Sequence, residues 1–172
     1  GVTSIFTYGP DGLRRSMTAN GVTTHFALDG QFAVREMQED GQGQLVSKAT
    51  YLVGPRGPEY RRDDTTVDPE EYDNHDPPLT RHEVRWYIYD GLGSVVGELD
   101  KDGNITAARK YDVYGGVRDT TGEGTTNHRF VGGLGHAQDD ATGPANFGLI
   151  YMRARYYDPA IGRFISEDPG RN

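Results

Sequence analysis

The sequence predicts an all-β protein built as an antiparallel meander of short hairpins. Glycine, tyrosine and proline are abundant, with 24, 11 and 9 copies among 172 residues. Glycine and proline favour turns over helices, whereas tyrosine is enriched in strands. Asn-Gly and Asp-Gly dipeptides, the strongest short-range hairpin signals, occur at Asn20-Gly21, Asp29-Gly30 and Asp40-Gly41. These observations favour a sheet and predict no helix of ten or more residues.

Residues 1–53 carry the clearest hairpin pattern. Between the turns lie the segments LRRSMT, VTTHFAL, FAVREMQ and QLVSKATYLV. Side chains alternate across a strand with period two, so Val22, Thr24 and Phe26 are predicted to share one face. We interpret this region as β-hairpin repeats.

Residues 54–83 interrupt the pattern and are predicted to form an acidic, proline-rich insertion loop. Residues 59–76 hold eight acidic residues against two arginines and supply most of the chain's net charge of −8. Clustered carboxylates are calcium ligands, but their spacing here matches no calcium-binding loop. A solvated charged loop is therefore the favoured interpretation.

The strand pattern resumes over 84–172. In HEVRWYIYDG, Val84, Trp86 and Ile88 are predicted to share one face of a strand. Two further strand-like segments flank the turn DKDG, and GHAQDDATG is predicted to hold at most one short helical turn.

An internal repeat runs through both strand-rich regions. FTYGPDG (6–12), FALDG (26–30), YIYDGLG (87–93) and KYDVYGG (110–116) each place an aromatic or large apolar residue before a turn. The units recur about every twenty residues, and each is predicted to be one hairpin with its aromatic residue packed inward. Units of this kind stack along a continuing sheet and do not bury their faces alone.

These repeats resemble the YD repeats, also called RHS repeats, and the end of the chain resembles the RHS-associated core. Tyr-Asp pairs stand at Tyr89-Asp90, Tyr111-Asp112 and Tyr157-Asp158. RARYYDPAIGRFISEDP is the most specific match, and the resemblance covers nearly the whole chain outside 54–83. The remaining residues of this fold signature are Arg153, Gly162, Arg163 and Phe164.

The resemblance implies a long β-sheet that spirals into a hollow shell, closed by the RHS-associated core over 84–172. In bacterial toxins such shells enclose a C-terminal toxic polypeptide, and in teneurins a related shell serves adhesion. We therefore expect a non-enzymatic structural module, secreted or at the cell surface. Its expected partners are the remainder of a longer polypeptide or identical copies, and an enclosed cargo.

The resemblance also implies a candidate catalytic site. Self-cleaving members of the family use an arginine and two aspartates, and Arg155 and Asp168 match the arginine and the first aspartate by position. Two carboxylates that share a proton can activate water. The second aspartate is expected further downstream, so a structural role is the favoured interpretation, and an autoprotease half-site is the alternative.

The composition argues against several other classes of function. The chain has no cysteine, and its five histidines show no metal-ligand spacing, so we expect no metal and no cofactor. Net negative charge disfavours nucleic acid as a partner, and no apolar run predicts membrane insertion. A third possibility is an adhesion module that binds surface glycans through Trp86, Tyr87 and Tyr89, although such rows more often pack between strands.

Overall fold

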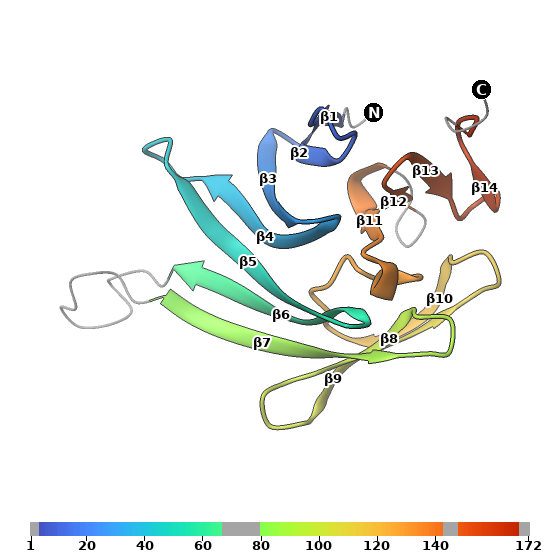
Figure 1. Ribbon diagram of the computed structural model, residues 1–172. Helices are drawn as coiled ribbons and strands as arrows, with labels where there is room; N and C mark the ends of the chain where they lie inside the picture. Colours follow the sequence, from blue (N-terminus) through green and yellow to red (C-terminus); the bar gives the residue numbers. More distant parts are fainter. Residues whose placement is uncertain (1–3, 67–79, 143–147, 169–172) are drawn as a thin grey trace.

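The computed structural model describes residues 4–66, 80–142 and 148–168 and confirms the predicted all-β fold. Ten strands form one antiparallel sheet, in which the order of the strands is their order in the chain (Figure 1). The predicted meander is thereby confirmed. The strands are β1 (Ile5–Tyr8), β2 (Arg14–Ala19), β3 (Val22–Asp29), β4 (Phe32–Glu39), β5 (Leu45–Gly54), β6 (Gly57–Thr66), β7 (Thr80–Tyr89), β8 (Val95–Leu99), β9 (Ile105–Tyr111) and β10 (Val117–Gly122).

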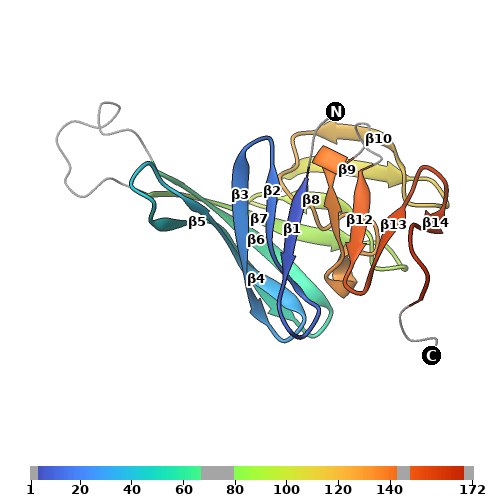
Figure 2. The same cartoon turned by 90° about the horizontal axis from the view of Figure 1, so that it is seen from above.

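A smaller antiparallel sheet of four strands follows: β11 (Ala137–Asp139), β12 (Leu149–Met152), β13 (Arg155–Asp158) and β14 (Arg163–Phe164). The large sheet curls around this inner sheet, with β1 and β10 on opposite sides of it (Figure 1). Seen from above, the inner sheet lies beside β1 (Figure 2). The ring of Phe6 on β1 is 5.2 Å from that of Tyr156 on β13. Neither sheet closes on itself within the described residues.

Helical structure in the described residues consists of two short 3-10 turns, Gly132–Leu134 and Asp140–Thr142. The second falls within GHAQDDATG, where one short turn was predicted. The first turn lies in the segment that connects β10 to β11 across the concave inner face of the large sheet, and the second lies between β11 and β12.

Four hairpin turns share a hydrogen-bond pattern that begins at an aspartate. In one of them, Oδ1 of Asp90 accepts hydrogen bonds from the backbone N–H of Leu92 at 3.0 Å and of Ser94 at 2.8 Å. Gly93 closes this turn with φ 89°, a left-handed conformation that glycine adopts without steric cost. Oδ1 of Asp40, Asp100 and Asp112 likewise accepts hydrogen bonds from the backbone N–H groups two and four residues further along the chain.

A hairpin turn forms at each of the three predicted dipeptides, but only Asn20-Gly21 supplies both of its turn residues. Asn20-Gly21 forms a two-residue turn, with φ 53° and 78°. In the next hairpin the turn residues are Gly30-Gln31, because Asp29 still pairs with Phe32 in the ladder. Asp40 begins a longer turn closed by Gly43, because its carboxylate bonds two N–H groups beyond the adjacent glycine.

The large sheet buries a polar face and exposes apolar side chains on the other. Tyr51 of β5 and Glu98 of β8 face the inner sheet and are 4% and 0% exposed, whereas Leu52 and Trp86 on the outer face are 46% and 43% exposed. Trp86 and Ile88 share a face, as predicted, but it is the outer one. The inner face therefore carries charges that need partners.

The loop predicted over 54–83 is wrong at both ends. Strands β6 and β7 pair from Tyr60↔Trp86 to Thr66↔Thr80. Two of the acids in β6 pair with arginines of the same strand, since Arg61 contacts Asp63 at 2.6 Å and Arg62 contacts Asp64 at 2.9 Å. Residues 67–79 lie outside the described residues, and the division into regions 1–53, 54–83 and 84–172 stays a prediction. The acids of the predicted loop in that stretch are Asp68, Glu70, Glu71, Asp73 and Asp76.

Replacing an aspartate that begins a turn should destabilise the sheet. Asp90→Ala removes the Oδ1 atom that accepts both hydrogen bonds and should lower the free energy of unfolding by about 1–2 kcal/mol, as loss of a helix cap does. Asp102→Ala is the control, because Asp102 pairs with exposed Lys101 at a turn tip and should change stability by less than about 0.5 kcal/mol. Urea unfolding of both variants measures the difference, and equal effects would contradict the assigned role of Asp90.

Candidate functional site

A buried ion pair joins the two sheets. Arg14 on β2 contacts Asp139 on β11 at 2.5 Å, with side chains only 3% and 1% exposed. The Arg14 guanidinium also lies 4.4 Å from the ring centroid of Tyr151. The backbone N–H of Arg14 donates to the Tyr151 hydroxyl at 2.9 Å. Burial disfavours the charged guanidinium, but Asp139 outweighs it and raises the pKa of Arg14 above its ordinary value. Burial raises the pKa of Asp139, and Arg14 opposes that rise, so each partner favours the charged form of the other.

A second buried ion pair anchors the chain that follows β10. Glu98 on β8 and Arg109 on β9 approach to 2.7 Å, with side chains 0% and 5% exposed. The other oxygen of Glu98 accepts a hydrogen bond from the backbone N–H of Thr125 at 3.0 Å. The carboxylate thus holds the connecting segment against the concave face.

Tyr51 is the centre of a third polar cluster. Its hydroxyl donates to Glu36 at 2.7 Å and accepts from Arg61 at 2.6 Å. Burial, with Glu36 adding to it, raises the pKa of Tyr51 well above its ordinary value, so the phenol is neutral. The edge of its ring meets His128 at a centroid distance of 5.0 Å. Polar contacts therefore recur at each point where the connecting segment crosses the sheet.

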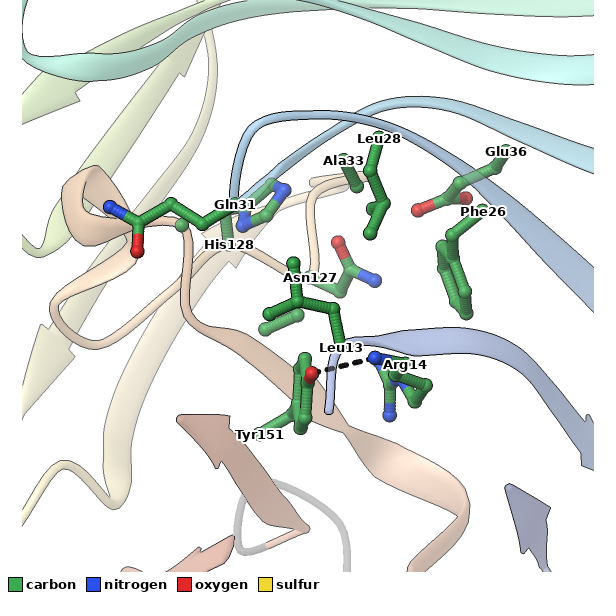
Figure 3. Close-up of a pocket in the computed structure, with 12 residues that line it drawn as sticks. Leu13, Arg14, Phe26, Leu28, Gln31, Ala33, Glu36, Asn127, His128 and Tyr151 are labelled. Carbon is green, nitrogen blue, oxygen red and sulfur yellow. Dashed lines mark hydrogen bonds between the residues drawn. The ribbon is translucent and has the colours of Figure 1, made fainter. Parts of the chain in front are cut away.

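A small cavity lies between these clusters (Figure 3). Its volume is about 30 Å³, and Arg14, Glu36, Asn127, His128 and Tyr151 are among its lining residues. That volume holds about one or two water molecules, whereas pockets for small organic ligands are typically about 300–1,000 Å³. The cavity is therefore part of the interface between the sheets and not a substrate pocket.

The two predicted catalytic residues are close together. Arg155 on β13 and Asp168 approach to 3.7 Å, with side chains 25% and 59% exposed. The Arg155 guanidinium also stacks on the ring of Phe164 at 3.7 Å. Beside this pair is an open groove of about 520 Å³, lined in part by Tyr8, Arg153, Tyr156, Ile165 and Ser166. The groove is large enough for an extended peptide, but no second aspartate lies along it in the described residues.

The tyrosines and aspartates of the predicted fold signature stabilise strands and turns of the two sheets. The Tyr89 hydroxyl donates to the Pro58 carbonyl, and that of Tyr111 donates to the Val95 carbonyl at 2.6 Å. Asp90 and Asp112 begin turns of the shared pattern, and the backbone N–H groups of Tyr114 and Gly116, with Arg118, lower the pKa of Asp112 although burial opposes them. In the last hairpin, Asp158 accepts from the Ala160 N–H at 2.8 Å and pairs with Arg163 in the ladder.

The other signature residues shape the end of the inner sheet. Arg153 has φ 60°, unusual for a residue other than glycine, and donates to the Leu134 carbonyl. Tyr157 packs edge-on against Phe164 at 5.6 Å. Gly162 also has a positive φ, 66°, and a Cβ there would lie 2.7 Å from the Tyr114 ring.

Sequence reasoning missed the residues that join the sheets. Arg14, Glu98 and Arg109 lie in predicted strands, and Asp139 lies in GHAQDDATG, where a short helical turn was expected and the structure has strand β11. The aromatic residues proposed for glycan binding are also split, because Trp86 is exposed on the outer face and packs on Tyr60 at 4.8 Å, whereas Tyr87 faces inward. No group of three or more His, Asp or Glu side chains in the described ranges is arranged to hold a metal ion.

The chain is similar in sequence to segments of much longer bacterial proteins. It is 28% identical to the double-stranded DNA deaminase toxin A of Burkholderia cenocepacia over 98% of this chain and 12% of that protein. It is 26% identical to the tRNA3(Ser)-specific nuclease WapA of Bacillus spizizenii and 25% identical to the tRNA nuclease WapA of Bacillus subtilis, in each case over 95% of this chain and 6% of the relative. No family model matches the chain.

Solved structures share its fold. A TcdB2-TccC3-Cdc42 crystal structure matches 96% of this chain with a TM-score of 0.67 and 22% identity, over 8% of that polypeptide. The Tc holotoxin pore of Photorhabdus luminescens matches 99% of this chain with a TM-score of 0.53 and 20% identity, again over 8%. The fold of this chain is thus that of a segment of toxin-complex polypeptides, in agreement with the predicted shell-like fold.

Two expectations need correction. The expectation that the protein is not an enzyme is contradicted, because the relatives are named as nucleases and a deaminase toxin. For the same reason the exclusion of nucleic acid as a partner has no support. Within the described residues no helix is long and apolar enough to cross a membrane.

Breaking the ion pair between the sheets should be costly. Asp139→Asn leaves Arg14 buried without a counter-charge and should lower the free energy of unfolding by about 3–5 kcal/mol. Asp140→Asn is the matched control, because Asp140 is half exposed and its pair with Arg129 should contribute at most about 1 kcal/mol. Urea unfolding distinguishes the two variants, and similar small losses for both would show that the Arg14–Asp139 pair does not hold the sheets together.

Proposed function

We propose that this chain is a wall segment of a longer toxin polypeptide and that it helps to enclose another part of that polypeptide. The observation that carries the proposal is the ten-stranded sheet in chain order, curled around an inner sheet that is fixed to it by the buried Arg14–Asp139 ion pair. The fold likeness to a segment of TcdB2-TccC3 supports it. The full protein is proposed to be secreted or displayed at the cell surface.

The open edges of the sheet support its place in a larger wall. Strands β1 and β10 each pair with one neighbour in the described residues, so their outer backbone N–H and C=O groups are available for a further strand. The proposed partners are adjoining segments of the longer polypeptide or, in their place, identical copies of this chain. A wall extended in this way would bury both edges.

The enzymatic activity is proposed to reside in the part of the longer protein that the wall encloses. The names of the relatives, which refer to tRNA and to double-stranded DNA, indicate nucleic acid as the substrate class. The residues at the concave face support this division of labour, since their charges pair with one another and the cavity between them is about 30 Å³.

Protease protection in the full-length protein tests the proposal. The toxin portion should resist proteolysis and show little nuclease or deaminase activity while the wall is intact. Asp139→Asn should expose it, because the inner sheet would lose its anchor, and Asp140→Asn should leave it protected. A toxin portion that is equally digestible and equally active in the intact protein and on its own would overturn the proposal.

Self-cleavage is a second candidate function, favoured by the proximity of Arg155 and Asp168. The guanidinium, held against Phe164, would keep the aspartate in place while a second carboxylate from elsewhere in the longer protein shares its proton and activates water. The water oxygen would add to a peptide carbonyl, and the C–N bond would break to give a carboxylate and an amine.

Substitutions in the full-length protein test this second function. Asp168→Asn should abolish release of the C-terminal fragment, and Arg155→Gln should slow it at least about tenfold, since a lost electrostatic contact at a reacting group costs at least that much. Glu167→Gln, at the exposed neighbouring residue, is the control and should cleave normally. Electrophoresis over time measures the fragment, and unchanged cleavage by Asp168→Asn would exclude the site.

A further inference from the structure

Two histidines lie at the junction of the two sheets. His128 is 3% exposed, and its Nδ1 lies 2.9 Å from the carbonyl oxygen of His136. A carbonyl accepts and does not donate, so Nδ1 of His128 carries the proton of the neutral ring. Edge-on contact with Tyr51 of β5 at 5.0 Å fixes the ring against the large sheet. His128 therefore sits where the connecting segment crosses the concave face.

Positive charges face both histidines from the surrounding elements. Arg14 of β2 and Arg61 of β6 face His128, together with Glu36 of β4, and Arg153 faces His136. The neighbouring acids are already engaged by these arginines: Asp139 with Arg14 at 2.5 Å, Asp63 with Arg61 at 2.6 Å, and Glu36 with Arg61 at 3.6 Å.

In the described part of the chain, Nδ1 of His136 has no nearby hydrogen-bond acceptor that would stabilise a second proton on the ring. Its Nδ1 is buried and has no hydrogen-bond partner among the described residues. A proton added to His128 would thus introduce a cation beside Arg14 and Arg61, whose carboxylate partners are already in use. A proton added to His136 would introduce one beside the Arg153 guanidinium. Burial of such a charge is unfavourable unless the site opens to water.

The direction of the pH effect follows from the pKa values of the two histidines in the docked and undocked states. Burial and then Arg153 lower the pKa of His136 to about 4, and burial lowers that of His128 although the His136 carbonyl opposes it. When the inner sheet leaves the concave face, both rings return toward the ordinary histidine pKa of about 6.5. The undocked state therefore binds more protons, and docking is favoured above pH 6.5 and weakens as the pH falls toward 4.

We propose that His128 and His136 form an acid-sensitive latch, which holds the connecting segment and the inner sheet on the large sheet at neutral pH and releases them on acidification. The release is local, because β5, whose Tyr51 contacts the His128 ring, is held by its own backbone ladder to β4 and β6. The large sheet keeps its ladder while the concave face opens.

Hydrogen exchange of the full chain between pH 7.5 and 4.5, expressed as protection factors, tests the latch. Below pH 6.5 the opening constant of residues 127–139 and 149–158 should rise about tenfold per pH unit for each histidine that gains a proton on opening. Strands β3 to β7 should retain their protection over the same range. Loss of protection in both sheets at the same pH and with the same slope would overturn the proposal.

Glutamine variants separate the latch from general acid unfolding. His136→Gln keeps the backbone carbonyl that binds His128 and should reduce the slope by about one proton per opening event. His82→Gln is the control on the outer face, where His82 is 49% exposed and contacts Asp64 at 2.7 Å, and it should leave the slope unchanged. A wild-type slope in His136→Gln would contradict the latch. The slope of His136→Gln therefore tests the latch even if His128→Gln does not fold.

Discussion

The structure depends on the pairing of charges buried between its two sheets. The concave face of the large sheet carries arginines and carboxylates where most proteins place an apolar core, and each such charge is costly to bury without a partner. Arg14 finds its partner on the inner sheet, and Glu98 holds the segment that leads there. Both partners lie in the chain that follows β10, so pairing them draws that chain and the inner sheet onto the concave face. The polar face thereby fixes how the two sheets dock.

The large sheet itself is built from local interactions. Each strand pairs with the next in the chain, and an aspartate sets the length and conformation of four of the turns. Such a sheet can be extended at either end without rearranging the strands already present. This property suits a chain that spans only a small fraction of the toxins it resembles, with 8% of the TcdB2-TccC3 polypeptide as an example.

The same interface links structure to the proposed functions. A wall that encloses a toxin portion must be tightly closed and yet able to open, and ionisable groups at a junction allow both. Neutral histidines among paired arginines favour the closed arrangement at neutral pH. The Arg155–Asp168 pair lies elsewhere, at the end of the inner sheet beside an open groove. Closure and self-cleavage would therefore rest on separate residues.

The sequence by itself determined the all-β class, the antiparallel meander and the placement of most turns, because period-two alternation and turn dipeptides are local signals. The resemblance to the RHS-associated core also indicated that Arg155 and Asp168 belong together. The sequence did not reveal that Trp86 faces outward, that β6 and β7 extend into the acidic region, or that Arg14 and Asp139 meet. Alternation shows which residues share a face but not which face is covered. Only the tertiary structure decided that, by bringing charges far apart in the chain within contact distance.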